Sequence, residues 1–480
     1  MSRNTFDLKI CIAGAGMGGL TAALALAKRG FRHIEVYEAA SNLGFVGAGI
    51  QLAPNMARIQ DALGVWKEIE KDAVVLEEAS IREGADDFEL STVDVRGVRA
   101  KYGYASMVGH RASLAAALYE GCKAHRSAIT FHFATSVSSV TSFSPHVTFT
   151  AVPRDESLQP CTITADIFLA CDGVKSIARA SLLNALNYSA HAQDTGQAAY
   201  RIMLTREQMS QDPELLELLD GNRFTRWIGP KRHIIAYPVS GKSIYNISTL
   251  QPDTSFAAAP SATYTTKGSK SAMMDVYGDF CPKVQRMLNL VPQNEVCEWK
   301  LRVHARLPTW VYGNLALVGD ACHPTLPHLN QGAAQAIEDA AVLAVTLSHL
   351  KDGSSKSVNE ALRAYETVRK ERAETLVELA AANGRAMHLS DADEEARAER
   401  DDQFKALREG GGSGVSLPSP DKSVDGQEKA VGEKEEETPG VEQSLLSDAR
   451  ALMSFWCVHL SIYASTARRQ HLSGTIDNKH

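Results

Sequence analysis

Apolar residues gather in short runs along this chain, and the runs alternate with glycine-rich turns and long alanine-rich stretches. The first run, residues 10–13, has the length and composition of a buried strand. Residues 20–28 consist mainly of alanine and leucine, which favour helix, and a second strand-like run follows at residues 34–37. The pattern therefore predicts a strand, a helix and a second strand in quick succession near the start of the chain.

The rest of the chain mixes strand-rich and helix-rich regions. Residues 56–69 predict an amphipathic helix, and residues 81–98 alternate loosely in the manner of strands. Two long helices are expected at residues 333–350 and 358–387, and the second interleaves acids and bases in the manner of a solvated face. Further strands are expected at residues 129–133, 137–140, 147–152, 167–171, 198–204, 224–228, 233–239, 244–250 and 315–318. Residues 240–243 form a plausible hairpin loop.

The turn between the first strand and the first helix carries Gly14-x-Gly16-x-x-Gly19. In this position Gly14 permits a tight turn, Gly16 lets backbone approach a pyrophosphate, and Gly19 lets helix and strand pack closely. The start of the helix offers N–H groups and a partial positive charge to phosphates. Glu38 closes the second strand and is placed to accept hydrogen bonds from an adenosine ribose. Because these features occur in register, the sequence predicts a dinucleotide-binding unit.

Composition narrows the possible partners. A net charge of −7 provides no basic stripe for a nucleic acid, and no apolar run reaches the ~18 residues that span a bilayer. The eight cysteines are scattered without a Cys-x-x-Cys pair, which suggests neither a zinc site nor a thioredoxin-type motif and fits a reducing compartment. No secretory signal precedes the first strand. We therefore expect a cytoplasmic protein without a metal site or a nucleic-acid partner.

Three separated motifs resemble one protein family. They are the Gly-Ala-Gly-Met-Gly-Gly turn with Glu38, the Asp-Gly-Val-Lys-Ser turn at residues 172–176 with Arg179, and the Gly-Asp-Ala-Cys-His-Pro motif that opens residues 319–340. Together they resemble the class A flavoprotein monooxygenases of the para-hydroxybenzoate and salicylate hydroxylase type, and above all the fungal branch that hydroxylates phenolic polyketides. The resemblance implies an α/β fold, in which a doubly wound, Rossmann-like FAD domain is interrupted by a β-sheet substrate domain and followed by a helical C-terminal region.

The resemblance also implies which residues hold FAD near its ring system. Asp320 matches the aspartate that holds the ribityl chain, since an acid at the end of a strand accepts hydroxyl donors. Gly332 and Ala333 start a helix whose N-terminus points at the isoalloxazine ring. The dipole of that helix favours an anionic reduced flavin.

Further cofactor-side residues follow from the same resemblance. Arg111 matches an arginine that contacts FAD on its pyrophosphate or ribityl side. Asp172, Gly173 and Arg179 match a motif linked to both FAD and NAD(P)H, whose role is as much structural as direct contact. Gln51 matches a position whose backbone lies near FAD.

On the substrate side, the resemblance points to Arg201 and Tyr237 in the strand-rich middle of the chain. An arginine stabilises a phenolate, which is the form that an electrophilic oxygen attacks best. A tyrosine can relay the phenolic proton. The alternative is that Tyr237 is a core aromatic and Arg201 a structural ion-pair partner. His328 stands in the loop that lines the family's pocket, either as a base or polar contact or as a simple loop histidine, and His323 shapes the same loop.

The implied activity is that of an FAD-dependent monooxygenase. NADPH or NADH, as a transient partner, reduces FAD, and O2 then gives a flavin C4a-hydroperoxide that hydroxylates a small phenolic substrate, in secondary metabolism or in aromatic breakdown. A salicylate-type decarboxylative hydroxylase is the nearest alternative. An FAD-binding scaffold or sensor without turnover is a second alternative. A flavin halogenase is disfavoured, because the Trp-x-Trp-x-Ile-Pro signature is absent.

The expected domain boundaries follow these motifs. Residues 1–185 and 298–409 are expected to form the two parts of the FAD domain, and residues 186–297 the substrate domain. Residues 410–443 have the composition of a disordered linker. In the tail, residues 444–480, Trp456 is present without the Tyr-Asp pair that the family commonly carries. The apolar part of the tail predicts a helix docked on the core, in preference to a membrane-surface contact.

Overall fold

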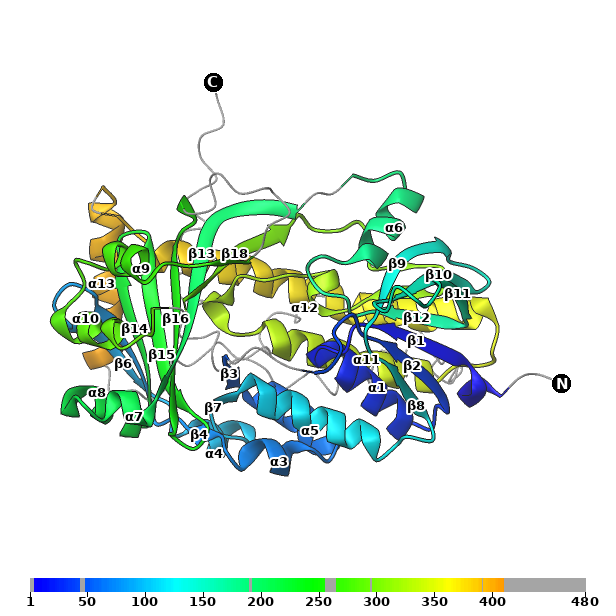
Figure 1. Ribbon diagram of the computed structural model, residues 1–480, viewed down its shortest axis with the longest axis horizontal. Helices are drawn as coiled ribbons and strands as arrows, with labels where there is room; N and C mark the ends of the chain where they lie inside the picture. The colour runs from blue at the N-terminus through cyan, green and yellow to red at the C-terminus, as the bar shows by residue number, and fades with distance from the viewer. Residues whose placement is uncertain are drawn as a thin grey trace, which may run out of the picture.

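The computed structural model describes residues 4–43, 48–189, 192–254, 265–293, 296–390 and 392–409. Figure 1 shows two bodies side by side, one built on a mainly parallel sheet and the other on a larger, mainly antiparallel sheet. Helix α12 (Ser355–Met387) extends across both bodies, and its 33 residues make it about 50 Å long. None of the helices in the described ranges has the length and hydropathy that a bilayer crossing requires.

A six-stranded sheet with the order β19-β20-β12-β1-β2-β8 forms the centre of the first body. Its strands are β1 (Lys9–Ala13), β2 (His33–Tyr37), β8 (Ile129–His132), β12 (Ile167–Ala170), β19 (Val311–Tyr312) and β20 (Leu315–Leu317). All neighbours are parallel except β19 and β20. Because β1, β12 and β20 run the same way, the turns that follow them all leave the same carboxyl edge of the sheet. This edge is where open α/β sheets bind their ligands.

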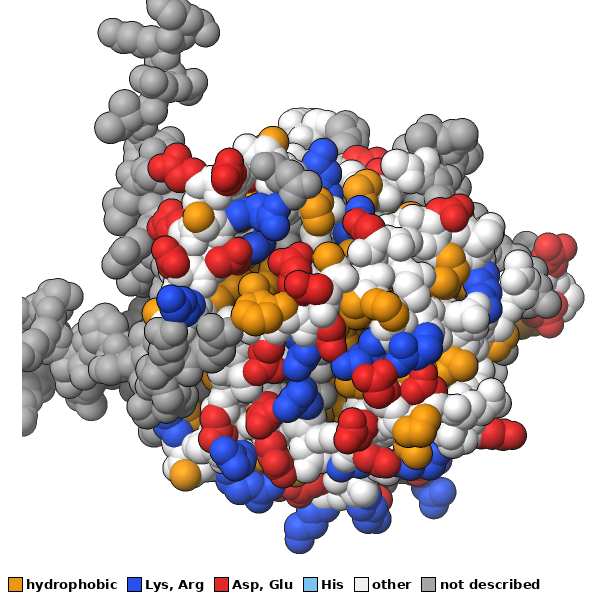
Figure 2. Space-filling view, turned by 90° about the vertical axis from the view of Figure 1, so that its left-hand side faces the viewer, with side chains coloured by type: hydrophobic (Ala, Val, Ile, Leu, Met, Phe, Trp, Pro, Cys, Tyr) orange, Lys and Arg blue, Asp and Glu red, His pale blue; other side chains and the backbone are white. Residues whose placement is uncertain are grey.

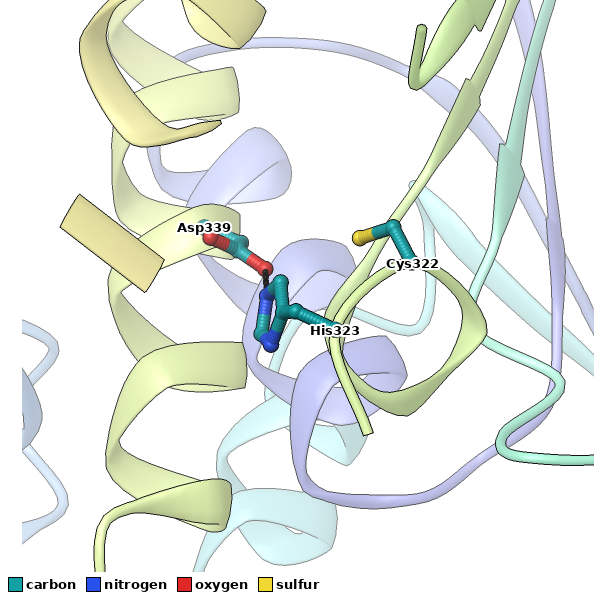
Figure 3. Close-up of side chains that lie close together, drawn as sticks. All are labelled: Cys322, His323 and Asp339. Atoms are coloured by element: carbon teal, nitrogen blue, oxygen red, sulfur yellow. Dashed lines mark hydrogen bonds and ion pairs between the residues drawn. The ribbon is translucent and has the colours of Figure 1, made fainter. Parts of the chain in front are cut away.

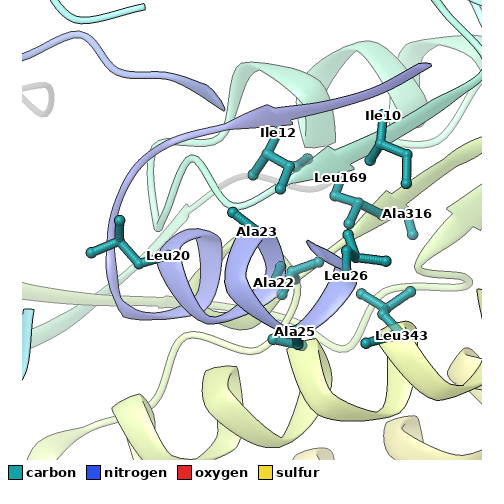
Figure 4. Close-up of a cluster of buried hydrophobic side chains, with 14 of the residues drawn as sticks. Ile10, Ile12, Leu20, Ala22, Ala23, Ala25, Leu26, Leu169, Ala316 and Leu343 are labelled. Atoms are coloured by element: carbon teal, nitrogen blue, oxygen red, sulfur yellow. The ribbon is translucent and has the colours of Figure 1, made fainter. Parts of the chain in front are cut away.

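Three helices pack together over one face of this sheet: α1 (Met17–Lys28), α5 (Arg111–Lys123) and α11 (Gly332–Ser348). Figure 4 shows Ile10 and Ile12 of β1 beside α1, with Leu343 of α11 on the far side of that helix. Every residue of α1 from Met17 to Ala27 is buried. The many alanines of α1 let its neighbours approach closely, so the helix lies in a core of fully buried side chains.

The opposite face of the sheet carries a smaller, three-stranded antiparallel sheet made of β9 (Thr135–Ser142), β10 (Val147–Pro153) and β11 (Cys161–Ala165). Helix α6 (Ile177–Ala185) packs against β9. Phe149 of β10 lies 4.9 Å from Phe168 and 5.2 Å from Tyr37, measured between ring centroids. Phe168 and Leu169 are neighbours on β12, so they point to opposite faces, and the sheet is buried on both sides.

The second body is built on an eight-stranded sheet with the order β17-β18-β13-β16-β15-β14-β5-β6. Its strands are β5 (Glu78–Glu83), β6 (Glu89–Asp94), β13 (Ala192–Thr205), β14 (Arg223–Gly229), β15 (Arg232–Val239), β16 (Ile244–Pro252), β17 (Thr265–Lys267) and β18 (Cys297–His304). Helices α8 (Pro213–Asp220), α9 (Lys270–Val276) and α10 (Pro282–Asn289) supply buried side chains to its outer face. Side chains alternate along β15, so Ile234 and Ala236 pack under these helices while Ile235 and Tyr237 lie on the other, inner face of the sheet.

The remaining elements connect the two bodies and cover their ends. A small sheet consists of β3 (Gly49–Leu52), β4 (Val74–Val75) and β7 (Met107–His110), with β7 in the middle. The other helices are α2 (Pro54–Ala62), α3 (Trp66–Glu70), α4 (Val98–Tyr102), α7 (Arg206–Met209) and α13 (Glu394–Glu409). Helix α13 packs on β6 and so covers one edge of the eight-stranded sheet.

The structure confirms the α/β architecture and revises several element boundaries. The single helix expected at residues 56–69 is two helices, α2 and α3, because Gly64 takes a left-handed φ of 75° between them. Residues 81–98 hold the end of β5, all of β6 and the first residue of α4. The large sheet takes strands from both sides of residues 186–297, because β5 pairs with β14 and β18 continues to His304. The expected linker and tail, residues 410–480, lie outside the described residues.

The end of the second body that faces the viewer in Figure 2 carries acidic and basic side chains in close alternation. Ion pairs account for this mixture on this part of the molecule, for example Arg286 with Asp212 and Lys283 with Asp87. No large region of one sign of charge is visible on this face. The face therefore has the character of an ordinary solvated surface.

Replacing Gly19 with alanine is expected to destabilise the fold, because an added Cβ would lie 1.9 Å from the carbonyl oxygen of Gly14. The carbonyl belongs to the backbone of the turn, and the Cβ is fixed to the backbone of α1, so no side-chain rotation relieves the clash. We expect a loss of about 1–3 kcal/mol in the free energy of unfolding, measured by urea denaturation. Gly16→Ala is the matched control, since a Cβ there meets nothing within 4 Å. An equal loss in both variants would contradict this interpretation.

Candidate functional site

A cavity of about 310 Å³ lies between the carboxyl edge of the six-stranded sheet and the inner face of the eight-stranded sheet. Its walls come from the glycine turn, from β3, from the start of α5, from the inner faces of β13, β15 and β16, and from the segment that follows β20. Nine of the residues expected from the sequence line it: Gly16, Gln51, Arg111, Gly173, Arg201, Tyr237, Asp320, Gly332 and Ala333. The fold therefore brings residues from distant parts of the chain to one cavity.

A second cavity, of about 390 Å³, adjoins the first at the glycine turn. It contains Gly14, Glu38 and Asp172, and it shares Gly16, Cys171 and Gly173 with the first cavity. Of the expected residues, Gly19 lines neither cavity, because it packs against the backbone of Gly14. The two cavities form one elongated depression along the carboxyl edge of the sheet, which suits a long ligand such as a dinucleotide.

Glu38 stabilises the glycine turn. Its carboxylate accepts hydrogen bonds from the backbone N–H groups of Ala15 and Ala40, both at 2.8 Å. The amide of Gly14 donates to the carbonyl of Tyr37 at 2.8 Å, and Gly14 takes a left-handed φ of 92°. Glu38 thus fixes the turn and also lines the depression.

The N-terminus of α1 is open toward the depression. Gly16 is its N-cap residue, and no side chain caps the helix. The first turn of α1 contains no acidic residue, and a Cβ on Gly16 would meet no protein atom within 4 Å. Free N–H groups, a helix dipole and empty space beside Gly16 together fit a pyrophosphate at this position.

The Asp-Gly-Val-Lys-Ser turn at residues 172–176 mainly stabilises the carboxyl edge of the six-stranded sheet. Asp172 accepts hydrogen bonds from the N–H groups of Ile177 (2.8 Å) and Ala178 (3.2 Å) at the start of α6, and Ser176 caps the same helix. Arg179 is buried and donates to the carbonyl of Ala321 at 3.1 Å, so it connects this turn to the segment after β20. The structural part of the role expected for this motif is therefore visible in these contacts.

Asp320 lies at the far end of the depression, in the turn that follows β20. Its side chain lines the first cavity and is exposed there. Burial raises the pKa of this carboxyl above its ordinary value, while nearby His323 and Arg111 act in the opposite direction. Gly319 permits the turn, because it has a left-handed φ of 62° and a Cβ there would lie 2.8 Å from the Cβ of Ala336.

The segment between the Gly319–Asp320 turn and α11 completes this wall of the first cavity. The 3-10 turn η4 (Pro327–Leu329) ends at Asn330, which has a left-handed φ of 55°. Helix α11 begins at Gly332 and has no side-chain cap, so its N-terminal N–H groups are open toward the cavity. A helix N-terminus stabilises negative charge that lies within about one turn of it.

A buried carboxylate, Asp339, holds the Gly319–Asp320 turn in place (Figure 3). It accepts hydrogen bonds from the backbone N–H of Gly319 at 2.9 Å and from Nε2 of His323 at 2.6 Å. Cys322 lies beside them, and burial raises the pKa of its thiol well above the ordinary value. The Cys322, His323 and Asp339 ligand atoms lie close enough to hold a metal ion. All three atoms already have hydrogen-bond partners in the protein, and this favours a structural clamp.

Asp339 is in turn held by Arg369 of α12, which is fully buried. The guanidinium donates from Nε to Asp339 at 2.7 Å and also pairs with Glu338 of α11. Asn55, at the start of α2, donates to Glu338 at 2.9 Å. Sequence reasoning missed this network, because the alternating charges of residues 358–387 resemble a solvated helix face. The buried partners of Arg369 lie on α11, which is distant in sequence. The sequence signal for this network was the pair of acidic residues, Glu338 and Asp339, within an otherwise apolar helix.

The inner face of the large sheet supplies the opposite wall. Arg201 of β13 lies 4.8 Å from the ring centroid of Trp299, and Tyr237 stacks on Phe224 at 5.7 Å. Burial lowers the pKa of Arg201, with a further contribution from nearby Arg111, and burial raises the pKa of Tyr237. Within the described ranges, neither arginine forms a salt bridge with an acidic side chain. The cavity therefore presents two cationic groups to its contents.

Replacing Arg369 with methionine is expected to cost about 3–5 kcal/mol of unfolding free energy, because Glu338 and Asp339 would become unpaired buried charges. The pairing lowers the pKa of Asp339 to about 2, so this stability is present above the ordinary carboxyl pKa and is lost as pH falls toward 2. Chemical denaturation at neutral and acidic pH measures both effects. Lys370→Met, on the same helix at a partly exposed pair, should cost less than about 1 kcal/mol. Equal losses in the two variants would refute the assignment.

Comparison with known proteins agrees with this geometry. The family model described as FAD binding domain matches residues 7–380. An FAD-dependent monooxygenase from Nectria sp, ntnJ, is 33% identical over 403 residues, which is 84% of this chain and 90% of that protein. A 3-hydroxybenzoate 6-hydroxylase from Aquipseudomonas alcaligenes is 32% identical over 363 residues, or 75% of this chain and 84% of that protein.

The fold is also that of solved flavoenzymes. A salicylate hydroxylase in complex with its substrate has a TM-score of 0.69 at 23% identity, with coverage of 84% of this chain and 94% of that one. The resemblance expected from the three motifs is confirmed by the extent of the family match. The chain belongs to the FAD binding domain family and is an FAD-dependent monooxygenase.

Proposed function

We propose that this monooxygenase holds FAD along the two joined cavities and hydroxylates a small phenolic substrate against the inner face of the large sheet. In this arrangement Gly14 and Gly16 with the N-terminus of α1 bind the pyrophosphate, and Glu38 binds the adenosine ribose. Bound FAD, reduced by NADPH or NADH, supplies the activation of O2. The observation that carries the proposal is the convergence of an uncapped helix N-terminus, an accessible acid and two cations on one depression.

The ring end of FAD is assigned to residues around the first cavity. Asp320 accepts hydroxyl groups of the ribityl chain, with Arg111 and the backbone at Gln51 nearby. The open N-terminus of α11 at Gly332 and Ala333 favours negative charge on the flavin ring. Asp172 supports the adenosine end through its cap on α6.

A phenol or phenolate suits the opposite wall. Arg201 and Arg111 favour the ionised form of a phenol, because two cations that form no salt bridge among the described residues lower the energy of an anion bound beside them. The stack of Arg201 on Trp299 fixes the guanidinium in place. Tyr237 has a raised pKa and remains a neutral hydroxyl donor at physiological pH. Relatives named as 3-hydroxybenzoate 6-hydroxylases and 6-hydroxynicotinate 3-monooxygenase act on hydroxylated aromatic acids, which supports this substrate class.

The direct test is to purify the protein with FAD and to measure NADPH and NADH oxidation, O2 consumption and product formation with a panel of phenols. Phenol, resorcinol, salicylate and 3-hydroxybenzoate form a suitable first panel. Oxidation that depends on the added phenol, with a hydroxylated product, supports the proposal. Release of CO2 from salicylate would identify decarboxylative hydroxylation instead. FAD binding without stimulated oxidation by any compound would indicate a scaffold or sensor.

Arg201→Ala is expected to retain FAD and to lose hydroxylation by a factor of about 100 or more, because the anionic substrate loses a fixed cation in a partly dry site. FAD absorbance and the yield of hydroxylated product measure the two properties. Arg206→Ala is the control, since Arg206 follows the same strand but pairs with Asp220 at the surface. Normal product formation in the Arg201 variant would remove this residue from the mechanism.

Asp320→Asn is expected to weaken FAD binding by about 10- to 100-fold, which corresponds to the loss of charge-assisted hydrogen bonds worth about 1.5–3 kcal/mol. The wild-type affinity should fall as pH decreases through the raised pKa of Asp320, because the carboxylate accepts hydroxyl groups better than the protonated acid does. Titration of apoprotein by flavin fluorescence across pH measures both effects. Asp352→Asn is the control at an exposed acid. A wild-type pH dependence that persists unchanged in the Asp320 variant would contradict the assignment.

A further inference from the structure

Asn246 lies on the inner face of β16, in the wall that would face the substrate. Its neighbours Tyr245 and Ile247 pack under the helices of the outer face, so the alternation along the strand turns Asn246 toward the first cavity, which it lines. Only 3% of the surface of Asn246 is exposed. A side-chain amide at this depth needs hydrogen-bond partners for both its oxygen and its nitrogen.

The oxygen of this amide has a partner in the protein. The backbone N–H of Gly49, in β3, donates to Oδ1 of Asn246 at 2.6 Å. A backbone N–H can donate only to the oxygen of an amide, so this bond fixes which way the amide is turned. The packing is close, since a Cβ on Gly49 would lie 2.6 Å from both Cγ of Asn246 and Cε2 of Tyr237. Asn246 is therefore held with its nitrogen directed away from Gly49.

The nitrogen of the same amide has no such partner. In the part of the chain that the structure describes, no group accepts a hydrogen bond from Nδ2 of Asn246. Nδ2 is also not one of the fully enclosed polar atoms that lack a partner, so it has access to open space. Because Asn246 is otherwise buried and lines the first cavity, that open space is the cavity. A fixed donor that opens into a cavity indicates an acceptor on the bound ligand.

The neighbours of Asn246 on this wall are donors as well. Tyr237 lies directly opposite Asn246 on β15, and Arg201 lies directly opposite Ser248, the next inward residue of β16. All four residues line the cavity, whereas the acid that lines it, Asp320, belongs to the other wall. A guanidinium, an amide N–H2 group and two hydroxyl groups all offer hydrogen atoms. The wall therefore suits a ligand with at least two oxygen acceptors, of which a phenolic oxygen supplies only one.

Strand geometry places these donors within reach of one aromatic ring. Arg201 on β13 and Asn246 on β16 are diagonal neighbours, since Arg201 pairs with Ser248 two residues along the strand. The Cα atoms of such a diagonal pair lie about 7–8 Å apart. Both side chains line the same cavity, so a ring whose phenolic oxygen lies at Arg201 can place a substituent at Asn246.

We propose that Asn246 is a specificity-determining residue, whose N–H2 group donates a hydrogen bond to a carbonyl oxygen carried on the ring of the phenolic substrate. This inference rests on the proposed function and narrows its substrate class to aromatic aldehydes and ketones that carry a phenolic hydroxyl group. Because Asn246 is uncharged, a neutral carbonyl satisfies it without adding a second anion beside the phenolate at Arg201. A phenol without a carbonyl group would leave a buried donor unpaired, and the site would discriminate against it.

The test compares wild-type protein, Asn246→Leu and Asn222→Leu, all full-length and loaded with FAD. The ligands are the three hydroxybenzaldehydes, each paired with the chlorophenol that has the same substitution pattern. Chlorine also withdraws electrons from the ring but accepts hydrogen bonds weakly, so the ratio of the two dissociation constants reports the carbonyl contact. Ligand-induced changes in flavin absorbance give these constants. Asn222 is the matched control, because it bonds to Glu77 and lines neither of the two joined cavities.

We expect wild type to bind at least one hydroxybenzaldehyde about tenfold more tightly than its paired chlorophenol. This preference should fall to about twofold or less in Asn246→Leu and persist in Asn222→Leu. A shift of β3 caused by the lost Gly49 bond would weaken both ligands of a pair and leave their ratio unchanged, so an unchanged ratio in Asn246→Leu would overturn the inference. Asn246→Ala repeats the measurement if the leucine variant does not retain FAD.

Wild type alone also tests the inference, and product analysis separates it from the proposed function. If wild type hydroxylates phenols but prefers no hydroxybenzaldehyde over its chlorophenol, the role assigned to Asn246 is wrong and the proposed function stands. If wild type holds FAD but hydroxylates none of these compounds or the phenols of the first panel, the proposed function fails, and the role of Asn246 fails with it.

Discussion

The carboxylate of Asp339 is the contact on which the geometry of the site depends. It joins α11 to the turn after β20 through Gly319 and His323, and it joins α11 to α12 through Arg369. All of these groups are buried, so each charge is stable only while its partner is present. The position of Asp320 at the end of the depression is therefore set by an ion pair that never touches a ligand. Asp320 is thus positioned by electrostatic interactions among buried residues that lie behind it.

The two walls of the site carry different kinds of charged and polar groups. The edge of the six-stranded sheet offers acids and open helix N-termini, which suit hydroxyl groups and phosphates respectively. The facing sheet, together with Arg111, offers cations that have no acidic partner in the described part of the chain. An anion bound between these walls thus meets positive charge from two directions. This arrangement suits chemistry in which a neutral aromatic compound must become electron-rich before it reacts.

Much of this could be predicted from the sequence, because the informative features are local. The glycine turn, Glu38 and the strand-to-helix motif at residue 319 each lie within a few residues of a predictable strand, and parallel strands bring their carboxyl ends together. The burial of Arg369 could not be predicted, because its partners lie on another helix and its own neighbours are charged. The contacts among His233, His328 and His388 could not be predicted for the same reason, since these three residues meet only through tertiary packing. The prediction of a single helix at residues 56–69 was wrong at Gly64, whose left-handed backbone conformation interrupts an otherwise continuous helical pattern.

The interleaving of the chain has a consequence for engineering. The large sheet receives β5 and β6 before the chain returns to the first body to form β8 and β12, and β13 to β18 come later. The substrate-side body is therefore not one contiguous stretch that could be excised and grafted onto another flavoenzyme. Recombination at crossover points that enclose only β13 to β18 would leave the transplanted sheet without its β5–β14 pairing. Altered substrate preference is better sought by changing side chains on the inner face of β13, β15 and β16, with the backbone left in place.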